Sequence, residues 1–375
     1  MYWHRRFWKS MDWWLFLLVL AIAGVGFVVI SSASPPDDVR GNLIRQGAAV
    51  AMGIIAWVIL LLLDYNELRQ LYWWIYGLNI LMLLAVVLIG VEINGNKNWI
   101  RLGPVQIQPS ELSKILLIIT LAKMLDGMER LQTWFDLFTP VMHVLPVFGM
   151  VILQGDLGTA LVFVAIPVAM VYGAGFPGIK ILGGAILGAA LIGGLVYSHY
   201  TFGTNFPIRE DQWARIDTFL YPEKDPQGSG YQVIQSKLAI ATGDVWGKGL
   251  GQGDRHKNDW LPFPHTDFVF AVVVEEFGLV GGVAVIALYA LIFFRLATVA
   301  FTARDRYGTL IVVGVTGLLA AHVLENIGMT MGLTPVTGIP LPFISYGPTA
   351  LLANLAAIGL VQSVAARRDP VQYDH

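Results

Sequence analysis

The sequence predicts an all-α, polytopic membrane protein with about ten transmembrane helices. The chain is 56% hydrophobic and only 13% charged. Apolar windows close to the roughly 20 residues that span a bilayer recur along the whole length. A transmembrane β-barrel would instead show alternating segments of about 10 residues, and the sequence has none. The chain has no cysteine, which excludes disulfides and thiolate metal sites.

The apolar windows divide the chain, read as a single polytopic domain over 1–375, into ten predicted spans. They are 12–33, 45–63, 70–92, 109–126, 140–154, 157–175, 180–200, 267–295, 307–332 and 348–366. The first resembles a signal peptide in its basic start, but its apolar core is long enough to span, and we interpret it as an uncleaved helix.

Charge placement predicts the orientation of these spans. With the N-terminus inside, twelve Lys and Arg residues fall in cytoplasmic segments and five in or beside short outer loops, which favours two cytoplasmic termini. Residues 201–266 then form one long extracytoplasmic loop. Within it, "GYQVIQSKLAIATG" has apolar residues at helical spacing, so we expect a short helix lying in the membrane interface. Loops of this length are usually functional.

Two groups of charged residues lie near the predicted outer ends of spans. Glu111 and Lys114, in "QPSELSK", are three residues apart and can pair on one helix face. They either stabilise the helix end or line a polar cavity, and the second reading is preferred because ionisable residues in membranes usually face such cavities. Asp156, in "QGDLGT", is placed to cap the sixth span, with a role in the same cavity as the alternative.

Three carboxylates accompany the eighth span, in "HTDFVFAVVVEEFG". Asp267 stands at its start, either as a helix cap or as a functional acid. Glu275 lies about 80° around the helix from Asp267, whereas Glu276 points nearly opposite. We therefore expect Glu275 near the cavity and Glu276 bonded to a neighbouring helix.

The stretch "PVTGIPLPFISYG" before the last span contains three prolines and two glycines, so no regular helix is expected there. Irregular backbone at membrane depth is tolerated only inside protein or beside a cavity. A plain outer loop is one interpretation. The preferred one is a re-entrant wall of the cavity, with Ser345 and backbone groups offering hydrogen bonds to a substrate.

These motifs together resemble the shape, elongation, division and sporulation family of membrane proteins. The signature "NIGMTMGLTPVTGIPLPFISYG", the three motifs above and "YPEKDPQGSGYQVIQSKLAIATG" occur in the family's order, the last being similar to the RodA branch. The chain departs from the family where Gly155 replaces a common Pro, Phe263 an acidic residue, and Pro348 a second Gly.

The resemblance implies a peptidoglycan glycosyltransferase with a fold similar to the GT-C-type enzymes. Such an enzyme joins the disaccharide units of lipid II during cell elongation and releases undecaprenyl diphosphate. The reaction needs a base for the acceptor hydroxyl, and Asp267 is the candidate. It also needs cations for the diphosphate. Lys114 is the first candidate, with outer-side alternatives at Arg101, Arg209, Arg215, Lys237 and Lys248.

The resemblance also implies partners and a cofactor. The partners are a class B penicillin-binding transpeptidase and other membrane proteins of the elongation complex, in the bacterial inner membrane. The transpeptidase helix is expected to dock on the glycine-containing eighth and ninth spans or, alternatively, on "LGGAILGAALIGG" of the seventh. A divalent cation, Mg²⁺ or Mn²⁺, is a further expectation, with Asp267 as either its ligand or the base.

Two other functions fit a membrane cavity. A transporter of lipid-linked precursors predicts charged groups along a path through both leaflets, whereas the charges carried by these motifs gather near the outer side. A scaffold that only recruits the transpeptidase gives no reason for Asp267, Glu111 and Lys114 at membrane depth. The sequence therefore favours the enzyme.

Overall fold

The computed structural model describes residues 10–35, 37–93, 96–103, 105–204, 210–225, 228–258 and 260–368. Ten long helices occur where spans were predicted, and the helical membrane fold is confirmed. They are α2 (Trp13–Ala33), α3 (Val39–Leu62), α5 (Tyr72–Ile89), α6 (Pro109–Asp126), α7 (Phe138–Leu153), α8 (Leu157–Gly173), α9 (Gly178–Phe202), α13 (Val269–Phe301), α14 (Arg306–Thr330) and α15 (Pro348–Ala366). A short α4 (Tyr65–Gln70) and a 3₁₀ turn, η1 (Trp134–Leu137), connect them at one end.

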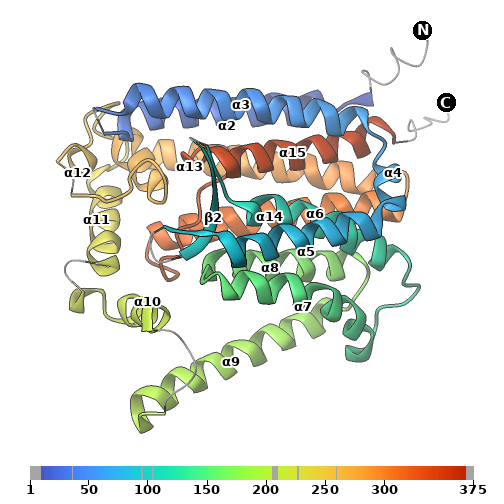
Figure 1. Cartoon of the computed structure of the whole chain (residues 1–375). Helices are drawn as coiled ribbons and strands as arrows, with labels where there is room; N and C mark the ends of the chain where they lie inside the picture. The colour runs from blue at the N-terminus through green and yellow to red at the C-terminus, as the bar shows by residue number, and fades with distance from the viewer. Residues whose placement is uncertain are drawn as a thin grey trace.

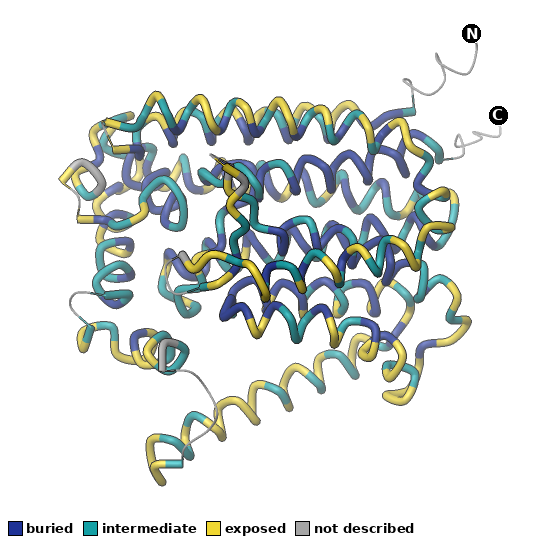
Figure 2. The backbone as a smooth tube through the Cα atoms, in the orientation of Figure 1, coloured by how far each residue is buried: buried dark blue, intermediate teal, exposed yellow. Residues whose placement is uncertain are grey.

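The long helices, except α9, form a bundle with nearly parallel axes (Figure 1). Within the described ranges, eight helices are long and apolar enough to cross a membrane, and α8 is a shorter apolar helix. The innermost is α15, in which 16 of 19 residues are buried (Figure 2). A Cβ at its Gly359 would lie 2.6 Å from the Trp57 Cα, so glycine permits α3 and α15 to pack backbone to backbone.

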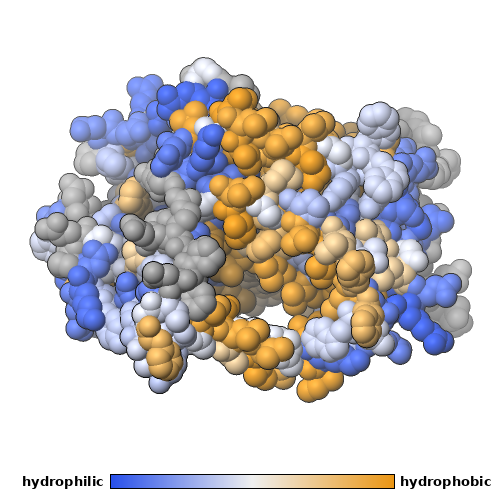
Figure 3. Space-filling model, turned by 60° about the horizontal axis from the view of Figure 1, so that its bottom comes forward, coloured by the Kyte–Doolittle hydropathy of each residue, from blue (hydrophilic) through white to orange (hydrophobic). Residues whose placement is uncertain are grey.

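The surface of the bundle has the polarity expected of a membrane protein. Figure 3 shows a broad apolar band between two hydrophilic ends. At one end Asp12, just before α2, contacts Gln362 near the end of α15. The opposite end carries α10 (Glu210–Leu220), α11 (Ser229–Thr242) and α12 (Asp254–Lys257) (Figure 1). We call these the terminal end and the loop end.

The all-α prediction missed a small sheet at the loop end. Strands β1 (Val91–Ile93), β2 (Asn96–Leu102) and β3 (Val105–Ile107) pair antiparallel in the order β1-β2-β3. Asn-Gly at 94–95, between Ile93 and Asn96, is a hairpin signal in the sequence, and Gly103 takes a positive φ of 60° between the second pair of strands. The signal was overlooked because the apolar windows dominate the sequence.

The predicted interfacial helix is present as α11. It lies across the loop end, roughly perpendicular to the bundle helices (Figure 1). Ser236 anchors it by donating a 2.8 Å hydrogen bond to the Thr330 carbonyl at the end of α14. The loop is therefore packed onto the membrane helices.

Helix α13 is interrupted at Gly278, where φ is 69°. The interruption leaves backbone groups of α13 without helical partners, and the loop supplies partners for them. Lys248 and Gly249 donate their N–H groups to the carbonyls of Glu275 and Glu276 at 3.0 and 2.9 Å. A Cβ at Gly278 would lie 2.3 Å from the Val245 carbonyl oxygen, so both the φ and the close approach require glycine here.

Helix α9 stands apart from the rest of the bundle. None of its residues is buried, and it leans away from the other helices (Figures 1 and 2). Each end of α9 has a contact outside the helix. His199 stacks on Trp213 of α10 with 3.9 Å between the ring centroids, and Lys180 Nζ donates a 2.5 Å hydrogen bond to the Gln132 carbonyl.

Candidate functional site

An irregular segment, 333–347, forms one wall of the site and agrees with the expected re-entrant path. Its carbonyls reach the middle of two long helices. The Tyr289 hydroxyl of α13 donates to the Pro342 carbonyl at 2.5 Å, and a Cβ at Gly26 of α2 would lie 2.7 Å from the Phe343 carbonyl oxygen. Residues 341–345 are buried. The irregular backbone thus lies inside protein, as a membrane requires.

Asp267 lies in the turn that precedes α13. The N-cap of α13 is Phe268, without a side-chain hydrogen bond, so the interpretation of Asp267 as a helix cap is wrong. The turn is fixed through its backbone instead. Asn326 of α14 donates to the carbonyls of both Asp267 and Ile339, each at 2.8 Å. The Asp267 carboxylate is left facing segment 333–347, with Oδ2 3.6 Å from where a Cβ of Gly338 would stand.

The surroundings of Asp267 suit a proton acceptor. Burial raises the pKa of its carboxyl to about 6, with the Thr266 hydroxyl and the Arg215 guanidinium opposing the rise. Burial also lowers the pKa of the neighbouring His265, against a weaker opposing effect of Asp38. At neutral pH Asp267 is therefore mostly ionised but holds a proton more readily than a solvated aspartate, which is what a general base needs.

A buried ion pair occupies the start of α6. Lys114 Nζ donates to Glu111 Oε1 at 2.8 Å, and the two side chains are 1% and 4% exposed. Lys114 Nζ also lies 2.9 Å from His322 Nε2 of α14. Within the described part of the chain Glu111 Oε2 has no hydrogen-bond partner although it is buried. Because buried carboxylate oxygens are rarely left unpaired, this one points to a ligand or solvent.

Asp156 caps α8, as predicted, and also accepts hydrogen bonds from two polar side chains. Its Oδ1 accepts from the Thr159 N–H at 3.0 Å at the start of α8. Its Oδ2 accepts from Asn98 at 2.7 Å and Gln108 at 3.2 Å. The α7–α8 junction before it contains Gly155 with a φ of 81°, a conformation that proline cannot take.

Helix α14 connects the Asp267 turn with the Lys114 pair. Asn326 holds the turn, and His322, four residues earlier, contacts Lys114. Side chains four apart share a helix face with Cβ atoms about 6 Å apart. The acid and the cation therefore face one region at the loop end. Glu325, three residues after His322 on α14, interacts electrostatically with Lys114, and its Oε2 is buried without a partner among the described residues.

Glu275 and Glu276 serve the loop. Glu276 accepts from Ser32 of α2, which confirms the expected bond to a neighbouring helix, and from the Gly251 N–H at 2.9 Å. Glu275 was expected near the cavity, but it engages the loop, accepting from Lys248 Nζ at 2.8 Å and the Asp254 N–H at 3.0 Å. Both carboxylates thus hold 248–255 against the interrupted helix.

The remaining predicted substrate residues occupy different places. Arg101 is exposed on β2, and Arg209 lies outside the described residues. Ser345 is buried, and its hydroxyl bonds the Thr266 carbonyl at 2.5 Å and the Leu341 N–H at 2.9 Å. Those contacts tie segment 333–347 to the Asp267 turn, and a contact of Ser345 with substrate stays a prediction.

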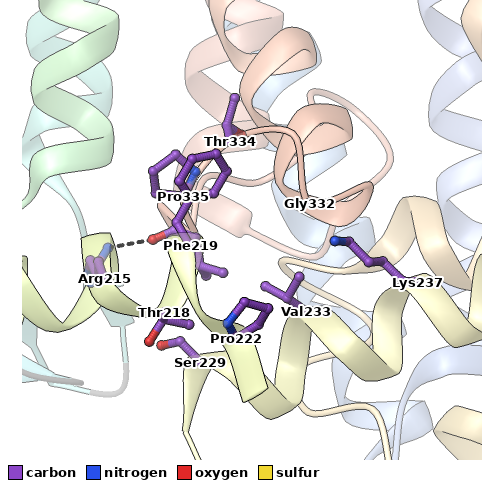
Figure 4. Close-up of a pocket in the computed structure, with 11 residues that line it drawn as sticks. Arg215, Thr218, Phe219, Pro222, Ser229, Val233, Lys237, Gly332, Thr334 and Pro335 are labelled. Carbon is purple, nitrogen blue, oxygen red and sulfur yellow. Dashed lines mark hydrogen bonds between the residues drawn. The ribbon is translucent and has the colours of Figure 1, made fainter. Parts of the chain in front are cut away.

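Arg215 and Lys237 line a pocket between α10, α11 and the segment after α14 (Figure 4). Arg215 donates to the Val336 carbonyl at 3.0 Å. The Lys237 stem crosses Gly332, where a Cβ would lie 2.1 Å from its Cε. Two cations therefore stand beside the wall that faces Asp267.

Three contributors to the site, His322, Glu325 and Asn326, were not predicted. Their signal in the sequence was present, because "HVLEN" places a histidine and a glutamate inside an otherwise apolar span. Only the packing of α14 against α6 shows which partner each one meets. Among the residues that the structure describes, no three His, Asp or Glu side chains are placed to hold a metal ion.

These observations define a helical membrane protein with an acid, a buried ammonium and unpaired carboxylate oxygens gathered at one end of its bundle. The family model of the cell cycle proteins FtsW, RodA and SpoVE matches residues 12–369. The chain belongs to this family, as its motifs predicted.

Similar proteins align over nearly the full length. Stage V sporulation protein E of Bacillus subtilis is 35% identical, covering 95% of this chain and 97% of its own. Peptidoglycan glycosyltransferase MrdB of Escherichia coli K12 is 32% identical, covering 97% and 96%.

Solved structures agree with the fold. A chain from a study of the structural coordination of polymerization and crosslinking by a peptidoglycan synthase complex has a TM-score of 0.80 at 35% identity, covering 96% of this chain and 99% of that one. The crystal structure of Thermus thermophilus RodA has a TM-score of 0.71 at 33% identity, covering 97% and 99%.

Proposed function

We propose that this protein polymerises lipid II into glycan strands during cell elongation, releasing undecaprenyl diphosphate. Relatives in the family carry the name peptidoglycan glycosyltransferase, which supports the predicted enzyme class. The observation that carries the proposal is the gathering of Asp267 and Lys114 at one end of the bundle, joined through one face of α14. A substrate with its lipid in the bilayer and its sugars outside would place its reacting bond at such a depth.

Asp267 is the proposed general base. Its carboxylate takes the proton of the acceptor sugar's 4-hydroxyl as that oxygen attacks the donor's anomeric carbon, and the bond to the diphosphate breaks. The raised pKa of Asp267, about 6, brings its basicity closer to working pH. The side-chain amide of Asn326 donates to the carbonyls of Asp267 and Ile339, which ties the turn to segment 333–347 and so holds the carboxylate in place.

Lys114 is the proposed partner of the leaving diphosphate. Its ammonium is 1% exposed and has two protein acceptors, which leaves a third N–H for a phosphate oxygen. In a dry site such a donor stabilises developing negative charge far more than it would in water. Arg215 and Lys237 are proposed to attract the anionic parts of the substrate. A role for Mg²⁺ or Mn²⁺ stays a prediction, and chelation of divalent ions during the assay tests it.

The predicted topology places the loop end outside a bacterial inner membrane and both termini inside. We propose that a class B penicillin-binding transpeptidase docks its single helix on α13, in company with other membrane proteins of the elongation complex. A structural neighbour comes from a complex that couples polymerization and crosslinking. Gly282 of α13 is buried within the chain, so an exposed residue of the same helix is the better site for a test. Ala287 is exposed on α13, and Ala287→Trp should reduce co-purification, whereas Ala51→Trp on the exposed face of α3 should not.

The proposed function is tested by polymerisation of purified lipid II by the purified chain, alone and with its transpeptidase. Glycan strands should form, and their absence under both conditions would refute the enzyme. The role in elongation is tested separately by depleting the chain in its host. Rounded cells are expected, and filaments with intact rod shape would assign the chain to division instead.

A further inference from the structure

His322 is fully buried in α14 and faces a lysine on another helix. Its Nε2 lies 2.9 Å from Lys114 Nζ. An ammonium group has only N–H donors, so Nε2 must accept this hydrogen bond and the imidazole must be neutral, with its proton on Nδ1. Nδ1 has no partner among the described residues. The contact with Lys114 is therefore the interaction that fixes this tautomer.

The second acceptor of Lys114 has a different geometry. Glu111 lies one turn earlier on the same helix, at 2.8 Å. A hydrogen bond to Glu111, on the same helix as Lys114, restrains the position of the ammonium along α6. It does not restrain the long lysine side chain from rotating around the helix axis. His322 approaches from α14 and removes this freedom. With two acceptors on separate helices, the direction of the remaining N–H is determined.

The neighbouring charge supports the same arrangement. Glu325, one turn after His322 on α14, interacts electrostatically with Lys114. Burying an ammonium away from water is costly unless opposite charges are near. Glu111, ion-paired with the ammonium at 2.8 Å, offsets that cost, whereas neutral His322 contributes direction without further charge.

We propose that His322 is a positioning residue, which aims the Lys114 ammonium at the departing diphosphate. The inference rests on the proposed role of Lys114 in the reaction. It assigns a part in catalysis to a residue of α14 that lies outside the motifs of the sequence analysis.

The test compares two replacements of His322 in the full-length purified chain with lipid II as substrate. His322→Leu keeps the volume and removes the acceptor. His322→Gln puts an amide oxygen at the position of Nε2, because both atoms are the fourth along the side chain. Hydrogen bonds to charged groups contribute about 10- to 100-fold, so kcat of the Leu variant should fall by about that factor with little change in KM. The Gln variant should recover most of it.

Two further variants control for structure. His322→Asn places its oxygen at the position of Nδ1 and should not rescue kcat. His143 of α7 is another buried histidine, 5% exposed, whose partners are Tyr72 and Thr120. His143→Leu should lower the thermal stability in detergent about as much as His322→Leu while leaving kcat of the folded protein unchanged.

A double-mutant cycle shows whether His322 acts through Lys114. Lys114→Met with His322→Leu should be no slower than Lys114→Met alone, because the histidine has nothing left to aim. If Lys114→Met is too slow for the steady-state assay, both members of the cycle are compared with the enzyme in excess over lipid II. Unchanged kcat in His322→Leu, equal losses in the Leu and Gln variants, or fully additive losses in the cycle would each overturn the inference. Normal turnover by Lys114→Met would refute the role of Lys114 itself.

Discussion

Replacing Asp267 with asparagine separates its chemistry from its structural contacts. The hydrogen bonds that hold this turn use backbone atoms of Asp267, and an amide of the same size leaves them in place. An amide cannot accept the acceptor sugar's proton. We therefore expect Asp267→Asn to insert and fold normally and to polymerise lipid II at least about 100-fold more slowly, the lower end for loss of a general base.

The activity of the native chain should also depend on pH through the ionisation of Asp267. With a pKa of about 6, Asp267 is about 90% ionised at pH 7 and about 10% at pH 5. Because the ionised form is the base, kcat/KM of the native chain should fall about tenfold between these pH values. The residual activity of Asp267→Asn should lack this acid limb. The lowered pKa of His265 places that group's titration further to the acid side.

The raised pKa of Asp267 also predicts how Asp267→Asn changes the stability of the fold. The folded chain binds a proton at Asp267 more tightly than the unfolded chain does, so its ionisation at neutral pH opposes folding. Asp267→Asn should therefore leave the melting temperature in detergent unchanged or raised. Asp225 is the control, since its carboxylate accepts from the N–H groups of Gly228 and Gly230 in the loop. Asp225→Asn should lower stability and leave turnover per folded molecule intact. Near-normal polymerisation by well-folded Asp267→Asn would refute the assignment.

Three other predictions concern the ion pair, the helix interruption and the loop. Exchanging the charges, Glu111→Lys with Lys114→Glu, should leave the polymerase inactive. A glutamate at position 114 would face Glu325 and could not hold a phosphate. Recovery of activity in the double variant would show that the pair is structural. Gly278→Ala should sharply lower the yield of folded protein, because φ is 69° and the added Cβ would lie 2.3 Å from the Val245 carbonyl oxygen. Gly188→Ala in α9, where a Cβ would meet open space, is the control and should not lower the yield. Equal yields of the two variants would contradict this explanation of Gly278. Glu275→Gln weakens the buried ion pair with Lys248 and should destabilise the loop by about 2 kcal/mol. Limited proteolysis within 244–258 should therefore become faster. An unchanged rate of cleavage would argue against the contact.

The long helices could be predicted from hydropathy because the bilayer imposes their length. All ten predicted spans coincide with helices to within about six residues at either end. The ion pair of Glu111 and Lys114 and the cap at Asp156 could also be predicted, since each depends on residues three apart in sequence. Contacts of this kind follow from helix geometry alone.

The rest of the site depends on which helices meet. Nothing within α14 indicates that His322 faces Lys114, 208 positions away, or that Asn326 holds the Asp267 turn. The helical periodicity of α13 was also misleading for Glu275. Asp267 lies in the turn before α13, so an angle measured along one helix does not relate it to Glu275. The Glu275 carboxylate pairs instead with the loop that packs against the interruption at Gly278.

The site lies where the regular structure of the membrane helices stops. Gly155 separates α7 from α8 next to Asp156, Gly278 interrupts α13 beyond the Asp267 turn, and segment 333–347 replaces helix altogether. Each interruption leaves backbone N–H and C=O groups that a membrane interior cannot satisfy with water. The chain satisfies them with its own loop, with Asn326 and with the hydroxyls of Ser345 and Tyr289. Because those partners come from distant parts of the sequence, they also fix the turn that carries the acid. Interruption of the helices therefore both opens a polar region at the loop end and makes it rigid, which is the condition for electrostatic catalysis by groups whose positions are set before the substrate arrives.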